Sequence, residues 1–326
     1  MRLADWREID SATVAPLWRE QTARWNGKLG WDSTATWAQV ETQRRAGNLP
    51  GLILVDSRGI CGWTFFLVHR GTLQIGALES DSPVSTEVLL DAVLSTAEPS
   101  IAPGGVMLFA FSDAPGILPA LADRGFITES YLYLVHDLAN AHRSGSAFSW
   151  SPAASAQMPS LLARAYEHPV LTRPFARQGT AAEWQEYAAQ LLAFDACGRF
   201  EPDLSATRMS SDDTLAGAIV TTVIGPKTAH LAQVVVDPTQ QGRGLGAAIL
   251  RDVNAKVKRA GFERVSLLVS GNNRAAVRLY SGSGFAGSER FISAGRGPVL
   301  TGVDATTYPR RLTRAAFDTG GASTLR

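Results

Sequence analysis

The sequence has few of the residues that build disulfide frameworks or metal centres. Only 2 of its 326 residues are cysteine, Cys61 and Cys197. They lie far apart and form no C-x-x-C motif, so we expect two reduced thiols and no bound metal. Lysine is also scarce, and the basic and acidic residues nearly cancel at a formal net charge of +1. This balance gives no electrostatic reason to expect a nucleic acid or an anionic membrane as a partner.

Long apolar runs are absent as well. No run approaches the length of about 20 residues that crosses a bilayer, and the segment Met1 to Arg7 is charged and leads into no apolar leader. We therefore expect a cytoplasmic protein that does not bind membranes. The 326 residues, of which 45% are hydrophobic, suit two domains of about 150 residues, each with a packed core. A small molecule or a peptide is the expected partner, and the oligomeric state stays open.

The sequence does contain a glycine-rich turn between a strand and a helix. The apolar strand 233–236 precedes the turn and a helical pattern over 245–260 follows it. The turn carries three glycines, at Gly242, Gly244 and Gly246. Glycine permits a tight turn and a close approach of the backbone to a ligand, and the free N–H groups that open a helix favour an anion. With Arg243 adding a positive charge, the turn is predicted to hold a phosphate group. A glycine-rich connector without a ligand is the alternative.

Two common phosphate-binding motifs fit this turn poorly. Residues 242–247 loosely match the G-x-G-x-x-G/A pattern of dinucleotide-binding folds, with Glu263 near the expected acidic position. In that pattern the first glycine follows the strand directly, whereas residues 237–241 intervene here. The turn does not end in the Gly-Lys-Ser/Thr of a Walker A loop either.

The spacing of the turn and of a second segment resembles the GNAT superfamily of N-acetyltransferases. Residues 241–246 fit that family's Q/R-x-x-G-x-G/A pattern, and residues 273–285 fit its N-x-x-A-x-x-L-Y-x-x-x-G-F segment. The resemblance covers roughly residues 150 to 295. It implies a mixed, mostly antiparallel sheet flanked by helices, with two central strands that splay apart, and it implies acetyl-CoA as the co-substrate.

The resemblance also assigns roles to individual residues. The strand edge that would pair with the pantetheine amides of acetyl-CoA is formed by Val234, Val235 and Val236. The loop that would hold the pyrophosphate consists of Gln241, Gly242, Arg243, Gly244, Leu245 and Gly246. Asn273 is expected to bond the pantetheine arm or to cap the helix that follows it. Tyr280 is expected to act as the general acid that protonates the departing thiolate.

No general base is assigned by the sequence. The candidates are His230, Glu201, Asp203, Glu167 and His168, each with a surface or capping role as the alternative. An acidic acceptor would find candidate partners in Arg173, Arg177 and Arg199, with solvated arginines as the alternative. A water relay is a further alternative to a dedicated base.

The first half of the chain repeats this pattern without its chemistry. Residues 120–126 parallel residues 279–285 at an offset of 159, which places Ser82, Ser85 and Glu87 opposite Gln241, Gly244 and Gly246. Periodicity predicts helices at 11–25, 33–47, 85–97, 153–166, 180–193 and 245–260, and strands at 52–56, 60–69, 73–78, 106–111, 131–136, 204–209, 215–224, 229–236 and 264–269. We therefore expect an α/β (α+β) protein of two tandem GNAT-like domains: a degenerate one over 1–143 and a catalytic one over 144–326.

The expected activity is transfer of an acetyl group from acetyl-CoA to a primary amine of a small molecule or peptide, by direct attack in a ternary complex. Two alternatives remain open. The tandem layout is similar to that of mycothiol synthases, which acetylate the amino group of a cysteinyl pseudodisaccharide. A regulatory protein that binds acyl-CoA without turning it over is the non-enzymatic alternative.

Overall fold

The computed structural model describes residues 1–96, 102–140, 147–193 and 197–297. The first half contains β1 (Arg2–Asp5), α1 (Ser11–Leu29), α2 (Thr34–Arg45), β2 (Gly51–Asp56), β3 (Gly59–His69), β4 (Thr72–Ser80), α3 (Pro83–Leu94), β5 (Val106–Phe111), α4 (Ile117–Asp123) and β6 (Ile127–Asp137). The second half contains α5 (Pro152–Ala165), α6 (Ala181–Ala193), β7 (Arg199–Phe200), β8 (Ala206–Met209), β9 (Leu215–Gly225), β10 (Thr228–Val236), α7 (Leu245–Arg259), β11 (Arg264–Ser270), α8 (Arg274–Gly282) and β12 (Ala286–Arg296). Apart from β1 at the start of the first half and the two-residue β7 in the second, both halves therefore run through two helices, three antiparallel strands, and then helix, strand, helix, strand.

A single mixed sheet runs through both halves in the order β1-β2-β3-β4-β5-β12-β6-β11-β10-β9-β7, with β8 beside β9. Two neighbouring pairs are parallel, β4 with β5 and β10 with β11, and the remaining pairs are antiparallel. Both parallel pairs are short, because the strands part after a few residues. The prediction of a mixed, mostly antiparallel sheet in two tandem GNAT-like units is confirmed.

The splay of the central strands appears in each half at the same place. β10 pairs with β11 only over Thr228–Leu231, and β4 pairs with β5 only over Leu73–Ile75. One residue further along, the register of β10 against β9 skips Ala232, and the register of β4 against β3 skips Gly76. A bulge bends and twists its strand, so each bulge turns the rest of the strand away from its parallel neighbour. The expected splay in the second half is confirmed, and the first half has retained it.

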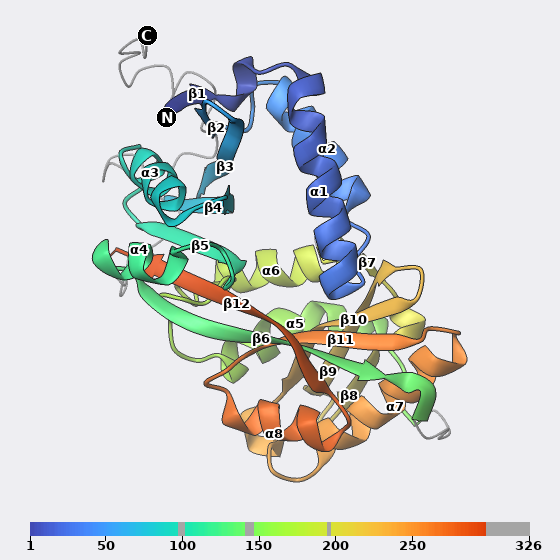
Figure 1. The fold of residues 1–326 in the computed structure, drawn as a ribbon. Coiled ribbons are helices and arrows are strands. Elements are labelled where there is room, and N and C mark those ends of the chain that lie inside the picture. The colour runs from blue at the N-terminus through green and yellow to red at the C-terminus, as the bar shows by residue number, and fades with distance from the viewer. Residues whose placement is uncertain (97–101, 141–146, 194–196, 298–326) are drawn as a thin grey trace.

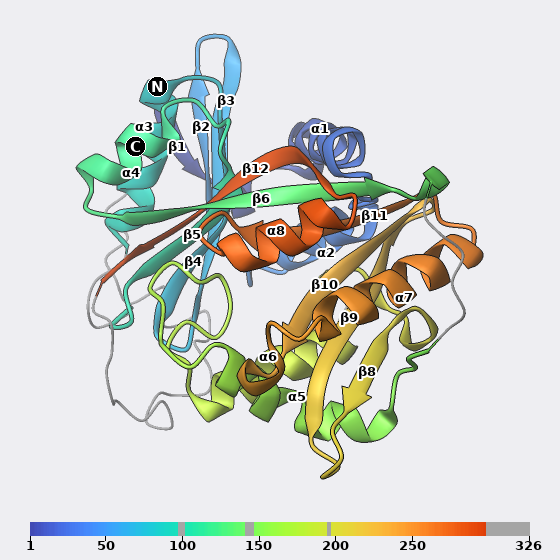
Figure 2. The same cartoon turned by 90° about the horizontal axis from the view of Figure 1, so that it is seen from below.

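The last strand of each half is exchanged with the other half. Residues Tyr131–Asp137 of β6 pair with the whole length of β11, although β11 belongs to the second half. β12 in turn pairs with β5 of the first half and with β6. Figures 1 and 2 show these two long strands crossing the middle of the molecule side by side. The first half therefore contributes a strand to the splayed sheet of the second, and the boundary predicted at 143/144 lies outside the described residues.

Helices cover both faces of the second half's sheet. The core on the face of α7 and α8 includes Ile249, Val253, Leu267, Tyr280 and Phe285. The core on the face of α5 and α6 includes Met158, Leu161, Trp184, Val220 and Val235. Figure 1 shows α7 and α8 on one side of β6 and β11, with α6 on the other side. Burial of each large apolar side chain stabilises the fold by about 1.5–3 kcal/mol. The two cores therefore hold the splayed strands in place from both faces of the sheet.

Some elements differ from those expected. Strand β12 was not predicted, because its sequence Ala286–Arg296 is rich in small and charged residues. The strand expected at 204–209 begins only at Ala206, after a single helical turn at Pro202–Leu204. Within those residues, no helix is both long enough and apolar enough to span a bilayer.

Candidate active site

The turn after β10 is held in shape by its own side chains. The carboxylate of Asp237 caps the single helical turn Pro238–Gln240 and forms an ion pair of 2.8 Å with Arg164 of α5. The side-chain amide of Gln241 donates a hydrogen bond of 3.0 Å to the carbonyl oxygen of Val236. These contacts direct the chain back toward the start of α7.

The glycine loop presents unpaired backbone donors to solvent. Gly242 and Gly244 have φ of 74° and 82°, a conformation that L side chains rarely adopt, and Gly244 is the N-cap of α7 without a side-chain cap. The first intrahelical bond runs from Ala248 to the carbonyl of Gly244, so the N–H groups of Leu245 and Gly246 have no intrahelical acceptor. A Cβ atom added at Gly242 or Gly244 would meet no heavy atom within 4 Å. The space in front of the loop is therefore open, and the exposed side chain of Arg243 borders it.

Gly246 has a different role from the other two glycines. It lies inside α7, and a Cβ atom there would approach Val236 and Leu279 at 3.5 Å. Its absent side chain lets the helix pack closely against β10 and α8.

The strand edge predicted for pantetheine is unpaired in the structure. Residues Gln233–Val236 pair with β9 on one side, and beyond Leu231 the other side has no strand partner within the part of the chain that the structure describes. The side chain of Val235 lies in the core beneath α5 and α6, and that of Val234 is partly buried against the core beneath α7 and α8. A free edge of this kind offers backbone N–H and C=O groups to an extended ligand.

Asn273 and Tyr280 occupy the two ends of the short helix α8. The side chain of Asn273 accepts a hydrogen bond of 3.1 Å from the N–H of Ala276, so Asn273 is the N-cap of this helix, as one of its two expected roles required. Tyr280 is 6% exposed and packs on Phe285. Its hydroxyl has no hydrogen-bond partner among the described residues, and burial raises the pKa of this phenol. The phenol therefore stays protonated at neutral pH and has a proton to donate.

A cluster of tyrosines that was not predicted lies beside the splay. The side-chain amide of Gln233 donates to the hydroxyl of Tyr166 at 3.1 Å and accepts from the hydroxyl of Tyr187 at 2.9 Å. Burial raises the pKa of Tyr166, and the proximity of Tyr166 adds to the upward shift in the pKa of Tyr280. Tyr166, the C-cap of α5, thus lies close enough to Tyr280 of α8 to affect its pKa. A polar Gln233 in an apolar strand was the one signal of this cluster in the sequence.

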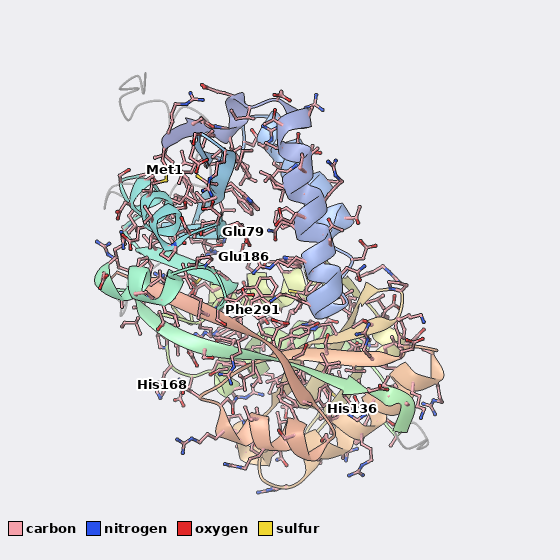
Figure 3. The ribbon with its side chains drawn as sticks, viewed as in Figure 1. Met1, Glu79, His136, His168, Glu186 and Phe291 are labelled. Atoms are coloured by element: carbon pink, nitrogen blue, oxygen red, sulfur yellow. The ribbon has the colours of Figure 1, made fainter. Side chains whose placement is uncertain are left out.

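The candidate bases do not gather at Tyr280. Glu167 and His168 are exposed on the loop between α5 and α6, and His168 points away from the molecule in Figure 3. Glu201 forms an ion pair with Arg199, and Asp203 is exposed.

The two arginines of the loop between α5 and α6 are not solvated. The guanidinium of Arg173 donates to backbone carbonyls of the same loop, including that of Phe175 at 3.0 Å, and lies 4.9 Å from the ring centre of Trp184. Arg177 donates to the carbonyl of Gly104. Both side chains are buried, and burial lowers the pKa of each. They fold the loop onto the sheet.

His230 is buried between the two halves rather than exposed to a substrate. Its ring stacks on Tyr133 of the exchanged strand, and Nδ1 lies 2.9 Å from the hydroxyl of Ser266. Burial lowers its pKa from 6.5 to about 4. The native state therefore keeps this imidazole neutral at pH values where the unfolded chain protonates it.

This shift predicts that acid weakens the fold. Because the native pKa is the lower one, the stabilisation is complete above pH 6.5 and is lost as the pH falls toward 4. We expect the free energy of unfolding to drop by about 2 kcal/mol between pH 7 and pH 5 through this group. Urea unfolding at both pH values measures it. His230→Gln should remove this part of the drop, whereas the exposed His168→Gln should not, and an equal drop in all three proteins would contradict the assignment.

Comparisons with known proteins agree with this geometry. The sequence model of the acetyltransferase (GNAT) family matches residues 162–285. A mycothiol acetyltransferase of Kineococcus radiotolerans is 44% identical over 64 residues, which are 19% of this chain and 20% of that protein. The match thus spans about a fifth of the length of the curated relative.

Solved structures share the fold at low sequence identity. A GCN5-related N-acetyltransferase from Sphaerobacter thermophilus superposes with a TM-score of 0.64 at 17% identity, over 92% of this chain and 99% of that one. A tandem GNAT protein from the clavulanic acid biosynthesis pathway superposes with a TM-score of 0.50 at 13% identity, over 77% of this chain and 83% of that one. Residues 162–285, which contain the glycine loop and the splayed strands, thus match the acetyltransferase (GNAT) family, and the chain as a whole shares the fold of these GNAT structures.

Proposed function

We propose that the protein is an acetyl-CoA-dependent N-acetyltransferase that acetylates a primary amine of a small molecule or peptide. The observation that carries the proposal is the continuity of three features in the second half. The unpaired edge of β10 runs directly into the open glycine loop, and the buried, unpartnered hydroxyl of Tyr280 lies on the helix that packs against both. A long thioester ligand such as acetyl-CoA needs all three features: an anion site for its pyrophosphate, a strand edge for its pantetheine arm and a proton donor at its thioester.

The residues of the site fit acetyl-CoA as a substrate. The free N–H groups at the start of α7 and the side chain of Arg243 would hold its pyrophosphate. The edge Gln233–Val236 would bond its pantetheine amides. Because a Cβ atom is missing at Gly242 and Gly244 and the space before them is open, the phosphates can approach the backbone closely.

The reaction requires one proton donor from the protein. Acetyl-CoA supplies the thioester: the amine nitrogen bonds to its carbonyl carbon, the carbon–sulfur bond breaks, the thiolate gains a proton and the nitrogen loses one. Tyr280 donates the proton to the thiolate, because its phenol is protonated at neutral pH and its hydroxyl is engaged with no other described residue, and water then returns a proton to the phenolate. The proton from the nitrogen passes to water, since none of the candidate bases lies at Tyr280.

The first half is proposed to bind no acetyl-CoA, because its equivalent loop is shortened and closed. The segment from the bulge to the helix N-cap has seven residues in the first half, Gly76 to Ser82, and thirteen in the second, Ala232 to Gly244. The offset of 159 therefore misaligned this region: Ser82, not Ser85, is the counterpart of Gly244. Ser82 caps α3 itself, and Pro83 packs against Gly116, where an added Cβ atom would lie 2.7 Å away.

A cysteinyl pseudodisaccharide is the second candidate for the acceptor. It is favoured by the 44% identity to mycothiol acetyltransferases, which lies within about a fifth of their length. The regulatory alternative is less well supported, because a protein that only binds acyl-CoA has little use for an unpartnered phenol beside the strand edge.

Calorimetric titration with acetyl-CoA, followed by a thiol-release assay against amines, tests the proposal. The amines should include aminoglycosides, amino-acid amides, N-terminal peptides and cysteinyl amino sugars. We expect one acetyl-CoA per chain and amine-dependent release of CoA. Binding without turnover on any amine would favour the regulatory alternative, and two ligands per chain would contradict the closed state of the first half.

A further inference from the structure

Glu129 reaches the second half's site on the exchanged strand. It lies on β6, two residues before Tyr131, which is the register partner of Ser270 at the end of β11. Alternation along a strand places Glu129 on the same sheet face as Tyr131. That face is opposite the one on which Leu132 and Leu134 pack beneath α7 and α8. It is the face covered by α6 and by the loop that precedes it.

The carboxylate of Glu129 is held by hydroxyl groups from two elements of the second half. Thr172, on the loop between α5 and α6, donates to one oxygen at 2.9 Å. Ser270, where β11 ends at the open side of the splay, donates to the other. Both contacts fix the carboxylate at the junction of the exchanged strand, the splay and the loop. Its negative charge also raises the pKa of the neighbouring Tyr131, after the larger effect of burial.

This carboxylate lacks the cationic partner that comparable carboxylates have. Other buried or half-buried acids form ion pairs with arginine or lysine, as do Glu41, Glu79, Glu186, Asp237 and Asp252. Among the described residues, Glu129 forms no ion pair, and the nearby guanidinium of Arg173 is occupied by backbone carbonyls. A half-buried negative charge without a counter-charge is costly, and a cationic ligand would offset that cost.

We propose that Glu129 binds the amino group of the acceptor in its protonated form, and so selects acceptors whose amine is a cation at neutral pH. The proposal rests on the proposed function, because it places the acceptor beside the splay. The first half then takes part in acceptor binding, because its last strand, β6, carries the negative charge that binds the acceptor at the second half's site. Glu129 is a specificity residue here, and the loss of the ammonium proton to water precedes attack.

Binding to the CoA complex tests this without turnover. Matched probes differ only in one amino group: L-cysteinamide with 3-mercaptopropanamide, and glucosamine with 2-deoxyglucose. Calorimetry at saturating CoA and pH 6.5, where an α-amino group of pKa about 7.7–8.0 is protonated, gives the preference for the amine. We expect at least one amine to bind about 10- to 100-fold more tightly than its partner. That preference should fall as the pH rises above the pKa of the amine.

Glu129→Gln should abolish the preference. It keeps an acceptor oxygen for one of the two hydroxyls, and its amide N–H can donate to the other, since a hydroxyl also accepts. Glu129→Asp keeps the charge and should retain part of the preference, and Glu263→Gln, an exposed acid, should change nothing. Unchanged affinity for CoA shows that each variant is folded. The proposal is wrong if no amine is preferred by the wild type, or if Glu129→Gln keeps the preference. If the protein prefers the amine through Glu129 but transfers no acetyl group, only the proposed function is wrong. If it transfers the acetyl group but shows no preference for the amine that depends on Glu129, only this inference is wrong.

Discussion

Gly244→Val is expected to reduce the affinity for acetyl-CoA by about 100-fold or more. The valine Cβ and its methyl groups would enter the open space before the loop, where the phosphates must come within hydrogen-bond distance of the backbone. Valine also resists the φ of 82° that Gly244 adopts as the N-cap of α7, so the loop would shift and misalign its N–H groups. Each charge-assisted hydrogen bond lost costs about 1.5–3 kcal/mol, and two such losses give the expected factor. Calorimetric titration measures it.

Gly261→Val separates the effect on the ligand from the effect of strain. Gly261 has φ of 90° just after the other end of the same helix, and a Cβ atom there would also meet nothing within 4 Å. Both variants should lose a similar amount of unfolding free energy, of the order of 1–2 kcal/mol. Only Gly244→Val should lose acetyl-CoA affinity. Equal affinities in the two variants would remove the loop from the binding site.

The features that local sequence determines were predictable. The glycine loop, the start of α7 at Leu245 and the cap of α8 at Asn273 depend on backbone freedom and on side chains a few residues away, which a motif records directly. The splay was predictable only through family resemblance, because Ala232 carries no mark of a bulge. The periodicities of the helices and strands likewise follow from burial of one face.

The strand exchange could not be predicted, because it depends on which of two similar partners a strand selects. β6 and β12 occupy equivalent places in the two halves, so either could pair with β5 or with β11 without changing its own pattern of burial. Local periodicity is the same for both arrangements. For this reason the sequence assigns Glu129 to the first half, and its contacts with Thr172 and Ser270 of the second half are visible only in three dimensions.

Tyr280→Phe is expected to lower kcat by about 10²- to 10⁴-fold while changing the affinity for acetyl-CoA by less than about twofold. The ring stays in place because it packs on Phe285 and belongs to the core of α7 and α8. The hydroxyl has no described partner to lose, so its removal should leave the fold nearly as stable. What disappears is the proton donor to the thiolate. Steady-state kinetics with the best amine, and titration with acetyl-CoA, measure the two quantities.

Tyr133→Phe is the matched control, since it removes a buried hydroxyl that acts only in the structure. Tyr133 donates a hydrogen bond of 3.0 Å to the carbonyl of Leu29 in α1, and burial raises the pKa of its phenol to about 12. Its loss should cost about 1 kcal/mol of stability and leave turnover nearly unchanged. Similar losses of kcat in both variants would mean that the phenols support the fold and not the chemistry. A normal kcat in Tyr280→Phe would mean that water, and not Tyr280, protonates the thiolate. The strand edge and the glycine loop would then position the thioester without assisting its cleavage.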